Sequence, residues 1–567
     1  MKRIAGKVLF GLAIAALGAS VALVAGCGDG ANGPRAAAIH APAVTVAKGA
    51  AYDAKITGRE VLTPPHGNAP RINAPAVYGC RPGRPMIYRI PTTGKRPIEF
   101  AAENLPASIR LEAKSGILIG TTPAKPGTYT VTFHAGNAHG RDTARLDLVV
   151  GDKLALTPPM GWNSWYTHYQ TINDAKTRAA ADAMVASGMA DVGYSYVSLD
   201  DCWMRMDPNR VPELMKRLGK NAAKVLDVKV KAGPTRANDG QILPARDFPD
   251  MKALTDHIHA YGLKAGIYTS PGPQTCARFE GSYGHEAQDA RTFADWGFDL
   301  LKYDWCSYSA VYGKRMKEFN NDPNKVLPEH KRPYEIMGPT LAGLGRDIEL
   351  NLCQYGMSEV WKWGAEVAGQ SWRIGGDLGF TLTRGGVYRT AKKTIDLRKY
   401  NGPSRWNDPD YLILGNWVPD RSEPPQPVNL TPGEQYSYVS LWCMMACPMF
   451  FSGDMATVDA FTYGLLCNTE MIAVNQDRLG ICAEPVVMDS NQWVLKKPMA
   501  DGSVVVGLFN LEKDAGREIA ITWTRLGLPG PAKARDLWRQ RDVDFPSEVL
   551  TVKLGPQGCA VFKIRGR

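Results

Sequence analysis

Aspartate and tryptophan side chains gather at the ends of short apolar segments in the middle of this 567-residue chain. Two carboxylates that flank an acetal are what glycoside hydrolysis needs, because one attacks or assists attack while the other donates a proton. Indole faces bind the C–H surface of a sugar. The pattern therefore indicates a sugar-binding pocket. The segments are 160–165, 196–203, 264–268, 300–306, 350–355, 372–377 and 406–410.

The same clusters lack the residue patterns of several other chemistries. They contain no His/Cys/Asp set at metal-ligand spacing, no glycine-rich phosphate loop and no Gly-x-Ser-x-Gly turn. These absences argue against metal-dependent hydrolysis, nucleotide use and serine esterase chemistry. The chemistry that remains is that of paired carboxylates among aromatic rings.

Composition and charge set wider limits on function. The chain is 44% hydrophobic and 22% charged, with 57 Gly and 40 Pro, which is typical of a soluble globular protein rich in turns. This composition excludes a disordered, collagen-like or polytopic membrane chain. Lys and Arg outnumber Asp and Glu by 67 to 56, but no block of five or more basic residues occurs. We therefore expect no nucleic-acid partner.

The elements that must hold these clusters are predicted from periodicity. Over residues 152–485, short apolar strands alternate with amphipathic helical segments such as 175–189 and 251–261, which favours a catalytic (β/α)8 TIM barrel. The carboxyl ends of barrel strands converge on one mouth, where the active sites of this fold lie. We also expect an antiparallel β domain over residues 486–567, because strand patterns return at 493–495, 504–509 and 560–564.

The region before the barrel contains two kinds of sequence pattern. Residues 28–85 are rich in Ala, Pro and Gly and are predicted to form a tether that contains a little β structure. Residues 86–151 alternate with period two between Gly, Pro and Asn turns, which predicts a small Ig-like β-sandwich. The stretches Gly116–Thr121 and Pro126–Tyr129 resemble the Ig-like modules of bacterial surface proteins.

Residues 1–27 resemble a bacterial lipoprotein signal peptide with its lipobox. An uncharged run from Val8 to Ala25 follows three basic residues, and the stretch Leu23–Cys27 places small residues before the cysteine. We expect lipidation of Cys27, and hence an exported bacterial lipoprotein of the cell envelope, facing the periplasm or exposed at the surface. Membrane contact is then expected only through this lipid anchor. An ordinary signal peptide is the alternative.

One group of motifs matches a known family when taken together: Pro159–Trp162, Leu199–Trp203, Gly262–Lys264, Gly266–Tyr268, Thr292–Gly297, Lys302–Asp304, Trp406–Asp410 and Asn475–Asp477. They resemble family 27 glycoside hydrolases, the α-galactosidase family, over residues 154–567. The resemblance implies a (β/α)8 barrel followed by an antiparallel β domain, with no metal and no organic cofactor. It also implies a retaining exo-glycosidase that removes terminal α-D-galactosyl residues from oligo- or polysaccharides by double displacement.

The resemblance assigns roles residue by residue. Asp304 matches the nucleophile, and Asp377, four residues after Arg373, matches the general acid/base. Asp408 and Asp410 are assigned to the scaffold, because the family places its proton donor in the Trp-Arg-x-x-x-Asp stretch. Substrate contacts are implied for Asp200, Asp201 and Lys302 with sugar hydroxyls, for Tyr268 near the ring, for Arg373 on the 2-position side and for Trp165 as an apolar wall.

Cysteine positions give a second comparison with the family. Cys276 and Cys306 match its disulfide across the substrate mouth, and an export signal permits such a bond. Cys202 and Cys353 lie at positions that are bridged in animal relatives, but no partner is found at the matching places here. We expect these two, and also Cys443 and Cys447, to be free and packed in the interior.

Two departures from the family bear on specificity. The loop after the fifth strand reads Cys-Glu-Trp in relatives but Cys353-Gln354-Tyr355-Gly356-Met357 here. Bulky Gln354 and Met357 are expected to contact the sugar and to crowd an N-acetyl group at C2, which favours galactose over N-acetylgalactosamine. An insertion at 207–244, rich in Lys and Arg, is expected to reshape the leaving-group side or to extend the surface.

Other functions stay open at this point. The same family includes α-N-acetylgalactosaminidases and β-L-arabinopyranosidases, so galactose-containing glycans are the expected but not the sole possible substrates. A protein of another class, a noncatalytic carbohydrate-binding surface protein that works through its Ig-like module, is a further alternative. The presence of both Asp304 and Asp377 argues against it. The sequence assigns neither the natural glycan nor the oligomeric state.

Overall fold

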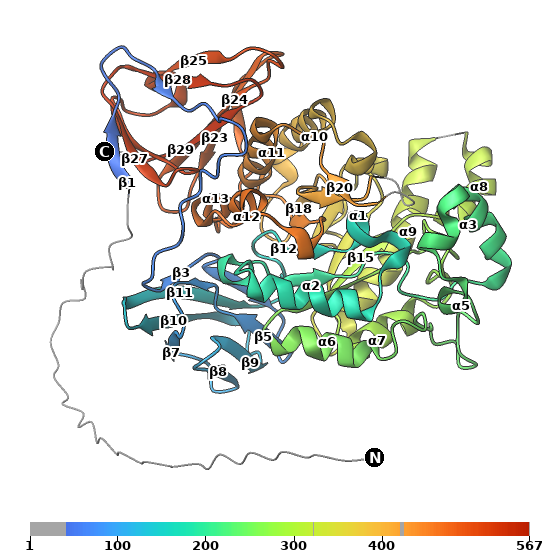
Figure 1. The fold of residues 1–567 in the computed structure, drawn as a ribbon. Coiled ribbons are helices and arrows are strands. Elements are labelled where there is room, and N and C mark those ends of the chain that lie inside the picture. The colour runs from blue at the N-terminus through green and yellow to red at the C-terminus, as the bar shows by residue number, and fades with distance from the viewer. Residues whose placement is uncertain (1–40, 321, 420–423, 566–567) are drawn as a thin grey trace, which may run out of the picture. The chain divides into compact units, whose positions relative to one another are not determined.

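The computed structural model describes residues 41–320, 322–419 and 424–565 (Figure 1). These residues belong to one compact unit. The predicted lipobox with Cys27 lies outside the described residues. Among the helices of the described residues, none is both long enough and apolar enough to cross a membrane.

Eight parallel strands form the barrel that periodicity predicts. Neighbours pair in the order β18-β17-β16-β15-β14-β13-β12-β21, and a parallel bridge between Leu412 and Phe451 joins the two ends of this sheet. The predicted (β/α)8 fold is therefore confirmed, and each of the seven clusters holds one strand. The strands are β12 (Met160–Asn163), β13 (Tyr196–Ser198), β14 (Lys264–Thr269), β15 (Leu300–Asp304), β16 (Glu349–Cys353), β17 (Ser371–Arg373), β18 (Trp406–Asp408) and β21 (Met449–Phe451).

The barrel strands are short apolar runs because both of their faces are covered. All residues of β15 and β16 are buried, as expected where side chains fill the barrel and helices pack outside it. Trp162, Trp372 and Trp406, which belong to three of these strands, are almost completely inaccessible to solvent. A packed interior of this kind fixes the strand ends, and with them the polar residues that follow.

Helices alternate with the strands as predicted. The expected helices at 175–189 and 251–261 are observed as α2 and α6, and the Asn173 and Asp250 side chains cap their first turns by accepting backbone N–H bonds. The longer helices of the barrel region are α2 (Asp174–Ala186), α6 (Met251–Ala260), α7 (Glu286–Trp296), α8 (Tyr308–Phe319), α9 (Pro323–Gly343), α10 (Arg384–Asp396) and α11 (Pro432–Met445). Shorter ones are α1 (Trp165–His168), α12 (Ala460–Leu466) and α13 (Thr469–Asn475).

The insertion at 207–244 is folded rather than a loose surface extension. It contains the short helices α3 (Val211–Leu218), α4 (Ala222–Val225) and α5 (Val228–Lys231). Leu214 of α3 is fully buried. The apolar face of α3 therefore ties the insertion to the barrel core.

Two sheets form the predicted Ig-like sandwich. One has the order β4-β11-β10-β7 and the other β5-β9-β8. Phe100, Phe133 and Leu148 belong to the apolar core of this module. The strands are β4 (Val77–Cys80), β5 (Pro85–Arg89), β7 (Glu99–Glu103), β8 (Ile109–Glu112), β9 (Ile117–Thr121), β10 (Gly127–Asn137) and β11 (Gly140–Val150). The sandwich therefore begins with β4, before the predicted boundary at residue 86.

The stretch expected to be a tether differs most from its prediction. Strand β1 (Ala41–Thr45) pairs in parallel with β27 (Arg541–Phe545) of the C-terminal domain, and β2 (Tyr52–Asp53) pairs with β28 (Val549–Leu554) (Figure 1). Tyr52 packs in the core of that domain and donates a hydrogen bond to Asp536 at 2.7 Å. Apolar side chains at the right positions thus recruit part of an Ala/Pro-rich segment into a sheet.

The C-terminal domain is an antiparallel β structure, as predicted. Its larger sheet has the order β1-β27-β26-β29-β24-β23-β22, and its smaller sheet has the order β2-β28-β25. Its strands are β22 (Glu484–Met488), β23 (Gln492–Pro498), β24 (Val504–Asn510), β25 (Arg517–Thr522), β26 (Ala532–Asp536), β27 (Arg541–Phe545), β28 (Val549–Leu554) and β29 (Cys559–Ile564), with the one-turn helix α14 (Trp523–Leu526).

Lys497 in β23 is buried, and burial of its charged form lowers the stability of the fold. Its side chain is fully buried, and its Nζ atom has no hydrogen-bond partner. Burial lowers the pKa of Lys497 to about 8. The folded protein therefore releases this proton at a lower pH than the unfolded chain does.

We predict that Lys497→Met stabilises the fold at pH 7 by about 3 kcal/mol, since a pKa lowered from 10.5 to about 8 costs 1.36 kcal/mol per unit when the group is charged. The stability difference between Lys497→Met and the wild type should shrink as the pH rises from 8 to 10.5, where only the unfolded wild-type chain still binds this proton. Denaturant unfolding across this range measures both effects. The control Lys496→Met, on the same strand as Lys497, removes an ion pair with Glu484 of β22 and should change stability by less than about 1 kcal/mol. An unchanged pH slope in Lys497→Met would contradict the assignment.

Candidate active site

A cavity of about 120 Å³ lies at the carboxyl ends of the barrel strands. Seven of the residues predicted to be catalytic or to contact the sugar line it together, although they come from different strands. They are Trp165, Asp200, Tyr268, Lys302, Asp304, Arg373 and Asp377. The barrel therefore brings together most of the predicted site, including both predicted catalytic carboxylates.

Asp304 is the last residue of β15 and is 6% exposed. Tyr268 donates a hydrogen bond to its Oδ2 atom at 2.8 Å, and Tyr355 donates one to Oδ1 at 2.7 Å. Burial raises the pKa of Asp304, and the Asp377 charge adds to this, while the Lys302 ammonium and the two phenols act in the opposite direction. The carboxylate is thus fixed in place and has two donors.

Asp377 lies in a more open position, after β17. Its side chain is 30% exposed, and its Oδ1 atom lies 3.3 Å from the buried guanidinium of Arg373. Arg373 also contacts Asp410 at 3.2 Å, so one cation connects two carboxylates. Burial raises the pKa of Asp410 to about 6, against the effect of Arg373. Access from the cavity suits Asp377 to exchange protons with a bound molecule.

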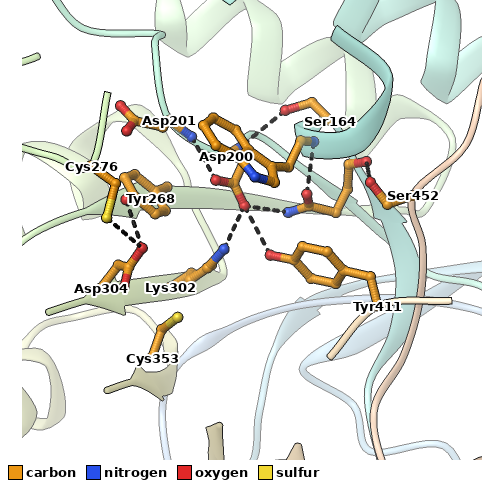
Figure 2. Close-up of polar contacts among 12 residues, drawn as sticks. Ser164, Asp200, Asp201, Tyr268, Cys276, Lys302, Asp304, Cys353, Tyr411 and Ser452 are labelled. Carbon is orange, nitrogen blue, oxygen red and sulfur yellow. Dashed lines mark hydrogen bonds and ion pairs between the residues drawn. The ribbon is translucent and has the colours of Figure 1, made fainter. Parts of the chain in front are cut away.

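A second polar cluster surrounds Asp200, which lies two residues after the end of β13 (Figure 2). Its Oδ2 atom accepts hydrogen bonds from Lys302 at 2.8 Å, from Tyr411 at 2.8 Å and from Asn163 at 3.1 Å. Lys302 also lies over the rings of Tyr268 and Tyr411. Asp200 and Lys302 therefore form a buried ion pair that offers an acceptor and a donor to a polyhydroxylated ligand.

Comparison with known proteins agrees with this geometry. Residues 157–228 and 215–477 match the family described as Alpha galactosidase A. The chain belongs to the α-galactosidase A family. Residues 489–564 match the family's C-terminal β-sandwich domain, and residues 69–151 match an Ig-domain family.

Individual members of the α-galactosidase family cover most of the chain. It is 33% identical over 419 residues to an α-galactosidase of Cyamopsis tetragonoloba, covering 73% of this chain and 87% of that one. It is 32% identical over 438 residues to α-galactosidase A of Cellvibrio japonicus, covering 73% and 94%. A Bacteroides fragilis structure assigned as an α-galactosidase/melibiase is 34% identical, with a TM-score of 0.76 and coverage of 88% and 98%.

The disulfide implied by the family is confirmed. Cys276 and Cys306 are bonded, with their Cα atoms 4.8 Å apart. Cys276 Sγ lies 3.6 Å from Asp304 Oδ2, so the disulfide borders the predicted nucleophile. The eight other cysteines of the described residues are free and buried, as expected for Cys202, Cys353, Cys443 and Cys447. The one group of three potential metal ligands within the described residues is Cys276, Asp304 and Cys306, and its two sulfurs are bonded to each other.

Asp201 does not line the cavity, although a sugar contact is implied for it. Its Oδ2 atom accepts the backbone N–H of Ala277 at 2.8 Å, and Oδ1 accepts that of Cys202 at 2.7 Å. Burial raises the pKa of Asp201 to about 6. In this structure Asp201 thus holds the loop that carries Cys276, while its neighbour Asp200 faces the cavity.

The predicted specificity residues Gln354 and Met357 are also absent from the cavity wall of the described structure. Gln354 is fully buried, and its amide donates to the Met357 carbonyl at 3.0 Å. The physical reason is a sharp turn, because Tyr355 and Gly356 have φ angles of 64° and 86°. This turn directs the Tyr355 hydroxyl to Asp304, so the expected crowding at C2 by Gln354 and Met357 is not what the structure supports.

Sequence reasoning missed several residues of the site. Tyr411 directly follows the Asn-Asp-Pro-Asp stretch, and its place next to that motif was the available signal. Asp410, which was assigned to the scaffold, lines the cavity through its pair with Arg373. Arg217 comes from the insertion, reaches the cavity wall and donates to the Cys276 carbonyl at 3.1 Å. The insertion therefore contributes one residue to the cavity wall.

We predict that Asp200→Asn destabilises the protein by about 3–5 kcal/mol, because it leaves the Lys302 ammonium buried without its counter-charge. The double variant Asp200→Asn/Lys302→Met should recover most of this loss, since it removes the unpaired charge. Thermal or denaturant unfolding of the two single variants and the double variant gives the coupling energy. Additive losses, with no recovery in the double variant, would show that the pair is not energetically coupled.

Proposed function

We propose that this chain is a retaining exo-α-galactosidase that removes terminal α-D-galactosyl residues from galactose-containing glycans. The observation that carries the proposal is that Asp304 and Asp377 line one cavity in an α-galactosidase-family barrel. One carboxylate is buried and held by donors, and the other is more exposed beside a guanidinium. The buried position with its two donors suits a nucleophile, and the more open position of Asp377 gives the access to a bound sugar that a proton donor needs.

The two carboxylates act in two steps. Asp304 attacks the anomeric carbon while Asp377 protonates the glycosidic oxygen, so the C1–O bond breaks and the aglycone leaves with that proton. A β-linked galactosyl ester on Asp304 results. Asp377, now a carboxylate, takes a proton from water, and this water attacks C1 and displaces Asp304. Galactose is released in its original α configuration, because each of the two steps inverts C1.

The remaining wall holds the sugar for this chemistry. The Asp200–Lys302 pair presents an acceptor and a donor to sugar hydroxyls, and the buried Trp165 supplies an apolar face. Arg373 fixes the position of Asp377 and is itself held by Asp410. The cavity therefore restrains both the sugar and the proton donor before the reaction begins.

Azide rescue is expected to separate the two catalytic roles by product stereochemistry. Asp304→Gly should lower turnover of an aryl α-galactoside by at least about a thousandfold, and added azide should restore activity with β-galactosyl azide as the product. Azide enters directly in place of the missing nucleophile and inverts C1. Proton NMR and mass spectrometry identify the product.

Asp377→Gly is the matched variant in this experiment. With an aryl aglycone that leaves without protonation, Asp304 still forms the ester, and azide then displaces it to give α-galactosyl azide. The same anomer from both variants would contradict the assignment of roles. Wild-type rates in both variants would overturn the proposed active site.

The sugar itself is proposed to be galactose without an N-acetyl group. Within a site lined by Arg373, Asp377 and Tyr268, the extra atoms of an acetamido group at C2 should overpack the wall, which commonly costs 1–3 kcal/mol or roughly ten- to a hundredfold in rate. We predict at least a tenfold preference for 4-nitrophenyl α-galactoside over its N-acetylated analogue. Gln354→Ser should not narrow this gap, because Gln354 lies off the wall. Equal rates on the two substrates would contradict the proposal.

We further propose that the protein is an exported lipoprotein of the cell envelope, anchored through Cys27. The support for this is the basic, apolar and small-residue pattern of residues 1–27. Partitioning of the expressed protein between detergent and aqueous phases tests it. Recovery in the aqueous phase would replace it with simple secretion.

A further inference from the structure

Tyr355 contacts the predicted nucleophile at the carboxylate oxygen that Tyr268 does not contact. Its hydroxyl donates to Asp304 Oδ1 at 2.7 Å, while Tyr268 donates to Oδ2 at 2.8 Å. Tyr268 and Cys276 line the cavity, and both contact Oδ2. Tyr355 is not among the lining residues of the described structure. Oδ2 therefore faces the substrate, and Oδ1 is held behind the wall.

The backbone at Tyr355 is strained in a way that serves this contact. Tyr355 has a φ of 64°, a conformation that is uncommon for a bulky residue. Gly356 follows with a φ of 86°, and a Cβ atom there would lie 2.4 Å from the Ile374 carbonyl oxygen. Such strain persists only where the surroundings enforce it, and it is frequent at active sites. Here it turns the phenol back toward β15.

The electrostatics of the pair fit a permanent donor. Burial raises the pKa of Tyr355, and the neighbouring Asp304 charge raises it further, so the phenol keeps its proton. A phenol proton on Oδ1 stabilises the carboxylate form of Asp304 more than the ester form, because the ester oxygen carries less charge. The contact therefore makes Asp304 less basic and a better leaving group.

We propose that Tyr355 is a positioning residue for the nucleophile, which holds Oδ1 of Asp304 throughout the reaction while Oδ2 forms and breaks the bond to C1. This inference rests on the proposed function. It assigns Tyr355 chiefly to the second step, in which Asp304 departs from the galactosyl ester. The phenol donates a hydrogen bond in both steps and transfers no proton.

Tyr355→Phe tests the proposal because it removes only the hydroxyl. With 2,4-dinitrophenyl α-galactoside, loss of the ester slows more than its formation, so kcat should fall at least about tenfold and KM should fall with it. A pre-steady-state burst of dinitrophenol should appear. The acid limb of kcat/KM should move up by about one pH unit, because ionised Asp304 loses a donor.

Tyr194→Phe is the matched control. Tyr194 is buried, whereas Tyr355 is partly buried, and the Tyr194 hydroxyl donates to the backbone carbonyl of Leu466, away from the cavity. Its loss should lower the melting temperature but leave the burst, the KM and the acid limb as in the wild type. This comparison separates a lost hydroxyl in the interior from a change at the nucleophile.

The outcomes are distinguishable. A wild-type enzyme that does not hydrolyse the galactoside refutes the proposed function. An active wild type whose Tyr355→Phe variant keeps the same acid limb and shows no burst refutes the inference alone. A fall in kcat with unchanged KM and an unmoved limb would also overturn it, since this result indicates only a disturbed fold.

Discussion

A carboxylate that is buried inside the protein is the constraint on which the rest of the site depends. Removing Asp304 from water disfavours its charge, so cations and donors must replace the lost solvation. The barrel register supplies them: Tyr268 of β14 pairs with Lys302 of β15, and Asp304 pairs with Cys353 of β16. Three consecutive strands thus place a phenol, an ammonium and the turn that carries Tyr355 around one side chain.

Each cation of the cavity wall pairs with carboxylates, which balances the negative charge of this acidic site. Lys302 pairs with Asp200, and Arg373 connects Asp377 with Asp410. Buried pairs of this kind add little net stability, but removal of one partner is costly. The arrangement therefore fixes positions rather than strengthening the fold. Pre-set dipoles and charges are what a transition state with developing charge requires.

The barrel and the two candidate carboxylates could be predicted for different reasons. Apolar runs with a polar end mark buried parallel strands, whereas the roles expected for Asp304 and Asp377 came from the resemblance to family 27 glycoside hydrolases. The path of the chain after β16 was not predictable, because no side-chain type signals a tyrosine with a φ of 64°. Its turn moved Gln354 off the wall and brought Tyr355 to the nucleophile.

At the N-terminus, the structure predicted from composition alone was wrong for a related reason. Residues 28–85 have the composition of a tether, but side chains such as Tyr52 find their partners at the far end of the chain, 484 residues away in the case of Asp536. No local pattern carries information of that range. The same argument applies to Arg217, whose place at the cavity depends on how the insertion folds.

The pairing of β1 with β27 has a consequence for the way the protein is made. Residues 41–45 leave the ribosome early in translation, but their sheet partner exists only after residues 541–544 have been synthesised. Until then the early strand has to stay unpaired, and β27 without it presents an open edge to other chains. Completion of the C-terminal domain is therefore tied to the end of translation. An expression product trimmed to the barrel boundary at residue 152 would leave that edge uncovered permanently.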